Sequence, residues 1–309
     1  MIRYFFPTIL VLMSAARAGE PIFIPQPRLV TEGVYAIAGP LGQRSKANFG
    51  LNATYAFIQT GQGVVLIDSG ASAYGAERLE RAIQSVTAEP IKWVINTGSQ
   101  DHRWLGNDYF SARGAAIHAL VATSETQKRY GTQHLQSIER FVGEQIKGTK
   151  VKLPDQTHNT ASASIVLGGL EIRLIQTDAH FPGDSMVHLP QKSVVVTGDL
   201  VYVERLLAVL PQSNVRKANA SFKELEKLSP KFLIPGHGSP TTLAKAREES
   251  GDYYKFLIGH IGAAAQEMEP MTETLDRFLA APDFSHLVGF DMLHRRNMNL
   301  VFLDFEKNP

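Results

Sequence analysis

The sequence predicts one α/β sandwich, in which two blocks of short strands pack together and helices cover their outer faces. Three observations support this prediction. Short apolar segments recur between turn residues, amphipathic segments of helical period separate them, and no stretch rich in Gly, Ser or Pro divides the chain. Apolar strands need cover on both sides, which helices on paired sheets provide. We therefore expect one domain over residues 19–239, with helices from 240 to 309 packed on it.

The composition is that of a globular protein. The 309 residues are 44% hydrophobic and 20% charged, which excludes a wholly disordered chain. Lys and Arg number 31 against 30 Asp and Glu, and this balance argues against a nucleic-acid binder, which needs surplus basic charge to displace counterions. The chain has no cysteine, so a metal would have to bind to His, Asp, Glu or Gln.

Residues 1–18 have the features of a secretory signal peptide. Arg3 gives a positive start, an apolar run follows, and Ala16-Arg17-Ala18 has the small-x-small form of a cleavage site. The run is shorter than the roughly 20 residues that a membrane helix needs, and no later segment is apolar enough to span a bilayer. The alternative is a buried N-terminal strand. We expect an exported protein, periplasmic or secreted, and the lack of cysteine suits an oxidising compartment.

The first block of elements is predicted between residues 33 and 145. Ser72 can cap a helix over 72–86, because Ala76, Leu79 and Ile83 share one face at helical spacing. Strands are expected at 33–39, 55–60, 64–68, 91–96 and 115–120, with a short helix after the polar loop 97–106 and a polar helix over 124–145.

The second block repeats the pattern between residues 164 and 235. Strands are expected at 164–167, 171–176, 185–189, 193–197 and 232–235, and a helix at 215–228.

Four polar segments directly follow predicted strands, where a sheet holds side chains rigidly and loops shape a pocket. They span 96–103, 177–184, 197–200 and 234–238. Each alone has a simpler interpretation as a turn or a structural hydrogen-bonding group. Together they place His and Asp at successive strand ends, and imidazole with carboxylate is a suitable ligand set for zinc.

These segments resemble motifs of the metallo-β-lactamase fold superfamily over residues 33–238. VVLIDSG at 64–70, AHFPGD at 179–184, TGDL at 197–200 and IPGHG at 234–238 carry the resemblance. It implies an αββα sandwich of two mixed β-sheets flanked by helices, with a C-terminal helical extension. It also implies that His180 is a zinc ligand, that Asp199 bridges two zincs and that His237 binds the second.

The segment NTGSQDHRWLGN at 96–107 departs from that pattern. Aligned without a gap, Gly98 and Gln100 take the places of the family's first two histidines. His102 then takes the place of its aspartate, and Arg103 that of the last histidine. If the loop shifts by one residue, Asp101 supplies the ligand instead of His102. Both alignments weaken the first metal site and leave a second site of His102 or Asp101 with Asp199 and His237.

Two mechanisms and a non-catalytic role follow from this pattern. In the first mechanism one zinc lowers the pKa of bound water, His180 is a base or orients the substrate, and Arg103 clamps a carboxylate or sulfur oxyanion. Asp101 is a further candidate catalytic residue. In the second, Gln100 and His180 hold another metal weakly. One zinc is favoured over two, because three ligands with an open position suffice. Alternatively, the positive charge of Arg103 repels the metal cation, and the protein has a non-catalytic binding role.

Residues 96–107, together with TGDLVYVERLLAVLP at 197–211, are similar to exported quinoprotein relay system zinc metallohydrolases. This resemblance implies association with periplasmic quinoprotein (PQQ-dependent) dehydrogenases. The expected activity is hydrolysis of a small-molecule ester, thioester, amide or sulfur-containing substrate, and the alternative is an accessory protein of such an oxidation system. A β-lactamase proper is the weaker choice.

Overall fold

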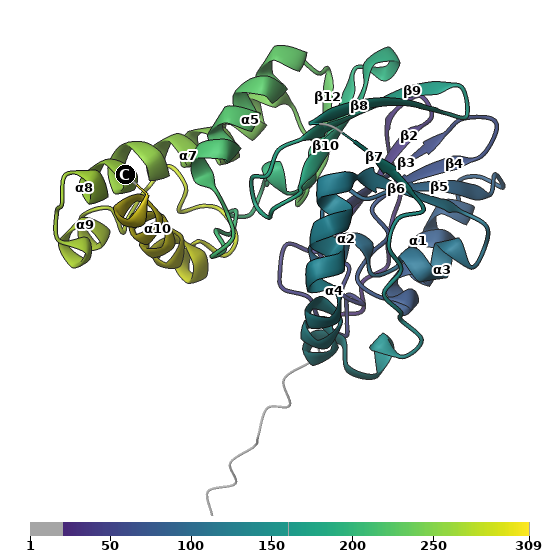
Figure 1. The fold of residues 1–309 in the computed structure, drawn as a ribbon, viewed down its shortest axis with the longest axis horizontal. Coiled ribbons are helices and arrows are strands. Elements are labelled where there is room, and N and C mark those ends of the chain that lie inside the picture. The colour runs from purple at the N-terminus through teal and green to yellow at the C-terminus, as the bar shows by residue number, and fades with distance from the viewer. Residues whose placement is uncertain (1–20, 160, 309) are drawn as a thin grey trace, which may run out of the picture.

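A computed structural model describes residues 21–159 and 161–308 and shows two β-sheets packed face to face between helices (Figure 1). The predicted α/β sandwich with helices after residue 240 is therefore confirmed. The predicted signal peptide, residues 1–18, lies outside the described residues.

The first sheet has seven strands in the order in which they occur in the chain. Its first four strands pair antiparallel and the remaining pairs are parallel, so the sheet is mixed. The strands are β1 (Arg28–Thr31), β2 (Val34–Ala38), β3 (Thr54–Gln59), β4 (Val64–Ile67), β5 (Ile91–Ile95), β6 (Ala116–Leu120) and β7 (Gln156–His158).

The second sheet has five strands in the order β12-β11-β10-β9-β8. All pairs are antiparallel except β11 with β12, which run parallel. The strands are β8 (Ser162–Leu167), β9 (Leu170–Gln176), β10 (Ser185–Leu189), β11 (Val194–Val196) and β12 (Phe232–Ile234).

The inner faces of the two sheets share one apolar core. Ile58 and Ile67 of the first sheet lie in the same buried cluster as Val187 and Ile234 of the second. Because alternate residues of a strand point to opposite faces, neighbouring apolar residues face outward, and helices cover them. These outward-facing residues and the helices form two further buried clusters. One lies under the helices of the first sheet and the other under the C-terminal helices.

Helices cover both outer faces, and those after residue 240 pack beside the second sheet (Figure 1). The Ser72 hydroxyl accepts from Gly75 N at 3.0 Å and so caps the first helix, as its sequence predicts. The helices are α1 (Ala73–Gln84), α2 (Asp101–Trp104), α3 (Asn107–Ser111), α4 (Val121–Val142), α5 (Val215–Leu228), α6 (Leu243–Ala246), α7 (Asp252–Phe256), α8 (Ala263–Gln266), α9 (Met271–Arg277) and α10 (Phe290–Lys307).

Two strands were not expected from the sequence. β1 and β7 are the edge strands of the first sheet, and both are largely polar or partly exposed. An edge strand buries little, so its sequence carries no apolar alternation to reveal it.

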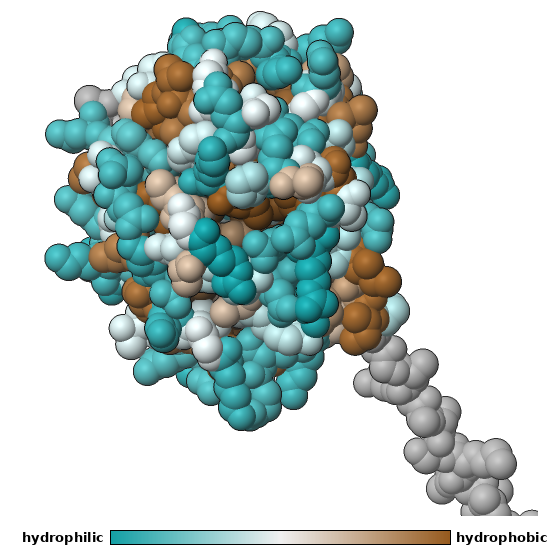
Figure 2. Space-filling model, turned by 90° about the vertical axis from the view of Figure 1, so that its right-hand side faces the viewer, coloured by the Kyte–Doolittle hydropathy of each residue, from teal (hydrophilic) through white to brown (hydrophobic). Residues whose placement is uncertain are grey.

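The face shown in Figure 2 is mostly hydrophilic, with small separate hydrophobic patches. Within the described residues, no helix combines the length and the apolar character that crossing a membrane would require.

Candidate metal centre

Loops at the ends of β5, β11 and β12 bring His102, Asp199 and His237 together. His102 lies in α2, Asp199 in the short 3₁₀ turn Gly198–Leu200, and His237 in the loop after β12. Their nearest ligand atoms all lie within 4.8 Å of one another, and all three residues are buried. A tight loop contact helps to place them, since a Cβ on Gly236 would lie 2.3 Å from the Gly198 carbonyl oxygen.

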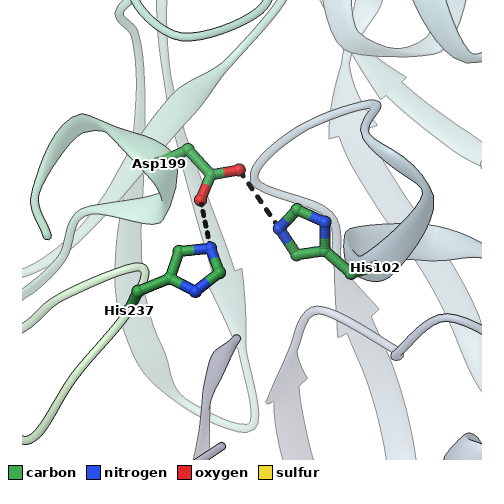
Figure 3. A group of neighbouring side chains, drawn as sticks. All are labelled: His102, Asp199 and His237. Carbon is green, nitrogen blue, oxygen red and sulfur yellow. Dashed lines mark ion pairs between the residues drawn. The ribbon is translucent and has the colours of Figure 1, made fainter. Parts of the chain in front are cut away.

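The Asp199 carboxylate lies between the two imidazole rings (Figure 3). Its Oδ2 is 3.4 Å from His102 Nε2, and its Oδ1 is 3.3 Å from His237 Nε2. Burial alone would raise the pKa of Asp199, but the charge of Arg103 holds it well below its usual range. The carboxylate is therefore an anionic ligand at neutral pH.

The backbone fixes the tautomer of His237. Its Nδ1 lies 2.8 Å from the Asn52 carbonyl oxygen, which can only accept, so Nδ1 carries the hydrogen. Burial lowers the pKa of His237 well below its usual value, so the ring is neutral. Its Nε2 lone pair then faces a carboxylate oxygen. Two acceptors facing each other need a cation between them, and a metal ion supplies one.

His102 has an unpartnered nitrogen directed at the same point. Its Nε2 is buried and has no hydrogen-bond partner among the residues that the structure describes. On the other side of the ring, Arg44 NH2, which can only donate, lies 2.5 Å from Nδ1, and Asp101 Oδ1 lies 3.2 Å from it. With Nδ1 accepting from Arg44, the ring hydrogen is on Nε2, 3.4 Å from Asp199 Oδ2. A metal on Nε2 would require that hydrogen to move to Nδ1, where Asp101 can accept it, as in carboxylate–histidine–metal arrangements. The three residues thus fit a zinc ion, with an open fourth position.

Arg103 does not line the cavity, which corrects the prediction that it clamps a substrate. The side chain is 1% exposed. Its NH1 lies 3.0 Å from Asp68, its Nε is 3.2 Å from Asp199 Oδ2, and its NH2 donates to Asp199 Oδ1 and to the Gly236 carbonyl. Burial opposes the charge, but the two carboxylates raise the Arg103 pKa above its ordinary value. With its donors engaged, Arg103 compensates buried charge and has none left for a substrate.

Asp101 lies behind His102 and is not in the cavity wall. Its Oδ1 accepts from Arg44 at 2.7 Å and from the His102 backbone N at 2.7 Å. The structure therefore places His102, and not Asp101, in the ligand group, and it leaves Asp101 to orient the His102 ring. As a ligand or a catalytic group in contact with substrate, Asp101 is not supported by this geometry.

His180 and Gln100 both line the cavity and are hydrogen-bonded to each other, at 3.1 Å between Nε2 and Oε1. Tyr202 OH is 3.5 Å from the same His180 nitrogen. Burial lowers the pKa of His180 to about 4, so the ring is neutral at pH 7. His180 lies outside the group that His102, Asp199 and His237 form.

Gly98 is not simply a missing ligand. A Cβ built on it would lie 2.6 Å from Asp184 Oδ1, a buried atom with no hydrogen-bond partner in the described part of the chain. The Asp184 carboxyl thus occupies space that a larger residue at 98 would need. Burial and the charge of Asp199 raise the pKa of Asp184 well above its usual value.

A cavity of about 140 Å³ opens onto the ligand group. Its walls include residues that sequence reasoning missed, namely Arg44, Tyr202, Arg205 and Arg296. Arg205 had one signal in the sequence, the charged pair Glu204-Arg205 within the otherwise apolar run 200–210. Tyr202, in the same run, had none, and neither had Arg44 and Arg296, which come from separate segments of ordinary composition.

Two facing mixed sheets with a His–Asp–His group at their loop end define a metal-site α/β sandwich. Residues 49–237, more than half of the chain, match the sequence profile of the metallo-beta-lactamase superfamily. The chain belongs to that superfamily. The comparison with curated proteins found no match.

Solved structures show the same fold at low sequence identity. A metallo-beta-lactamase from Pontibacter korlensis is 17% identical with a TM-score of 0.60, covering 75% of this chain and 99% of its own. The mono-zinc form of FIM-1 from Pseudomonas aeruginosa is 13% identical with a TM-score of 0.61, covering 77% and 97%. A double mutant of the sec-alkyl sulfatase PisA1 is 17% identical with a TM-score of 0.72, covering 91% of this chain and 50% of its own. Because the match to the sulfatase covers 91% of this chain, it must include residues of the C-terminal helices.

Proposed function

We propose that the protein is an exported hydrolase that works with a single zinc ion held by His102, Asp199 and His237. The observation that supports this most directly is the unpartnered His102 Nε2, directed with His237 Nε2 at the Asp199 carboxylate. When bound there, zinc would supply Lewis acidity and lower the pKa of water. The substrate class is a small-molecule ester, thioester, amide or sulfur-containing compound.

The chain's own groups would position the substrate in the cavity. Neutral His180 and the Gln100 amide, hydrogen-bonded to each other in its wall, can orient a polar group. A pKa of about 4 makes His180 a weak base at pH 7, so we assign it hydrogen bonding to the substrate rather than proton removal. The buried ligand group keeps bulk water away from the Asp199 carboxylate, which strengthens its electrostatic interactions.

One observation favours a second candidate, a periplasmic accessory protein of a quinoprotein oxidation system. Arg103 already neutralises Asp199, and this pairing weakens the attraction of the carboxylate for a metal. In that role the site would bind metal weakly or not at all. The similarity of residues 96–107 and 197–211 to quinoprotein relay proteins supports a periplasmic location beside quinoprotein dehydrogenases for either candidate.

Metal content separates the two candidates. Protein purified without chelator is expected to contain about one zinc per chain by mass spectrometry of the metal, because three ligands form one site. His237→Gln and Asp199→Asn should lose it, whereas His260→Gln, an exposed histidine outside the site, should keep it. Zinc-loaded protein should hydrolyse members of a p-nitrophenyl ester and sulfate panel, and His237→Gln should not.

Two results contradict the proposal in different ways. Wild-type protein that stays metal-free in excess zinc would end the zinc assignment. Protein with stoichiometric zinc that cleaves nothing in the panel, and whose folded His237→Gln variant keeps the biological role, would favour the accessory protein.

A further inference from the structure

The cavity beside the ligand group is strongly cationic, although the chain as a whole carries a net charge of only +1. Arg44, Arg205 and Arg296 all line it, and no carboxylate side chain is part of its described lining. Such a concentration of one sign of charge in a small cavity raises the local concentration of ligands of opposite charge. The question is which of these arginines already has a partner.

Arg44 has its counter-ion, since its NH2 lies 2.7 Å from Asp101 Oδ1. Arg296 is exposed at the rim on α10. Arg205 differs from both. It is 7% exposed and forms no ion pair within residues 21–159 and 161–308. Over the same residues, its Nε is buried without a hydrogen-bond partner.

Within the part of the chain that the structure describes, the contacts of Arg205 leave most of its donors unused, and its guanidinium carbon lies 5.9 Å from the centre of the Tyr202 ring. NH1 donates to the Gly42 carbonyl at 3.3 Å. NH1 is also 3.5 Å from His237 Nδ1, but that nitrogen carries the hydrogen donated to the Asn52 carbonyl, so it offers no acceptor. Buried Arg103 shows the usual arrangement, in which carboxylates surround the guanidinium. A buried, unpaired guanidinium is costly, and an anion that enters the cavity removes that cost.

The cavity limits the size of that anion. Its volume of about 140 Å³ admits a small head group, and apolar Leu210 and Leu293 line the same space. The planar guanidinium has a donor geometry that matches carboxylate and phosphate oxygens in pairs. The cavity therefore suits a compact oxyanion attached to a short apolar part.

We propose that Arg205, assisted by Arg296 and Arg44, forms an oxyanion-binding subsite beside His102, Asp199 and His237. The substrate of the proposed hydrolase would then carry a negatively charged sulfate, phosphate or carboxylate head group. This assignment of a substrate class rests on the proposed function, but the subsite itself does not require hydrolysis.

Calorimetric titration of the full chain with sodium sulfate, sodium phosphate or sodium acetate tests the subsite, with ionic strength held constant by sodium chloride. At least one of the three anions should bind saturably at one site per chain. Arg205→Met should weaken that binding at least tenfold, and Arg205→Lys should weaken it less because charge remains. Arg277→Met, which breaks an exposed pair with Glu269, is the matched control and should bind like wild type. The anion that binds most tightly identifies the head group.

Zinc content is measured on the same samples. Arg205→Met that keeps its zinc but loses anion binding supports the subsite. Absence of saturable binding to wild type, or equal binding by Arg205→Met, overturns it even if zinc is present. Anion binding by wild type that stays zinc-free in excess zinc would contradict the proposed function while leaving the subsite intact. If Arg205→Met does not fold, Arg205→Lys and Arg296→Gln replace it as test variants. The subsite is then supported only if both weaken anion binding.

Discussion

At the residue scale, the replacement of a family histidine by Arg103 changes the charge of the site. The guanidinium lies between Asp68 and Asp199 and supplies positive charge without a metal. The sequence alone suggested a substrate clamp, because a charged residue in a polar loop is usually accessible. The side chain instead turns inward, where two carboxylates offer it more hydrogen bonds than a substrate could.

Arg103→Met should therefore destabilise the protein strongly. Removing one partner of a buried ion pair leaves the other charge uncompensated, which costs about 3–5 kcal/mol. Urea denaturation measures the loss, and Arg277→Met, at an exposed pair, should cost about 1 kcal/mol or less. Equal losses for both variants would show that Arg103 does not stabilise the buried carboxylates.

At the element scale, the loop between β5 and α2 determines which metal position exists. Gly98 lies in the middle of this loop, residues 96–100, and leaves room for the Asp184 carboxyl. A family-like histidine at 98 would displace that carboxyl, and its neighbour Gln100 offers only a neutral oxygen. The first metal position therefore lacks its ligands, and the Asp184 carboxyl occupies part of its space.

Gly98→His is expected to destabilise the chain by roughly 1–3 kcal/mol, because it overpacks a buried site. It should not raise the zinc content above that of wild type. Thermal unfolding and metal analysis test both parts, with Gly259→Ala as control, since nothing lies within 4 Å of a Cβ there. A second zinc in Gly98→His would show that only the ligand was missing.

At the scale of the whole molecule, the two sheets and the C-terminal helices bury many histidines in the neutral form. Burial is the main cause of the lowered pKa in each case, and for His118 the nearby His158 ring, 3.1 Å away, adds to it. The histidines with lowered pKa are His118, His134, His158, His180, His188, His237 and His294. Asp184, with its raised pKa, acts in the opposite direction on acidification.

His118 isolates this effect because it lies on β6, away from the ligand group. Its pKa is about 4 in the folded protein, against about 6.5 when unfolded. The unfolded state therefore binds the proton first, so stability falls as the pH drops from about 6.5 towards 4. His118→Gln should lose less stability over that range, by about 2 kcal/mol. Parallel stability–pH curves for variant and wild type would contradict the assignment.

Several features of the structure could be predicted from the sequence alone, and others could not. Ser72 as a helix cap and the helix at Val215–Leu228 were predicted correctly, because capping and helical period depend on neighbours within a few residues. The order of the four polar segments also placed His102, Asp199 and His237 at strand ends. The edge strands β1 and β7 were missed, since they bury too little to leave a pattern.

The sequence by itself determined the sandwich fold, because apolar period and turn chemistry are local properties that any packing must satisfy. Only the tertiary structure decided that His102 rather than Asp101 faces Asp199, that Arg103 is buried between two carboxylates, and that Arg205 pairs with no carboxylate of the described residues. Side-chain direction and charge pairing depend on loops from different strands approaching within a few ångströms, and that approach is set by how the two sheets pack.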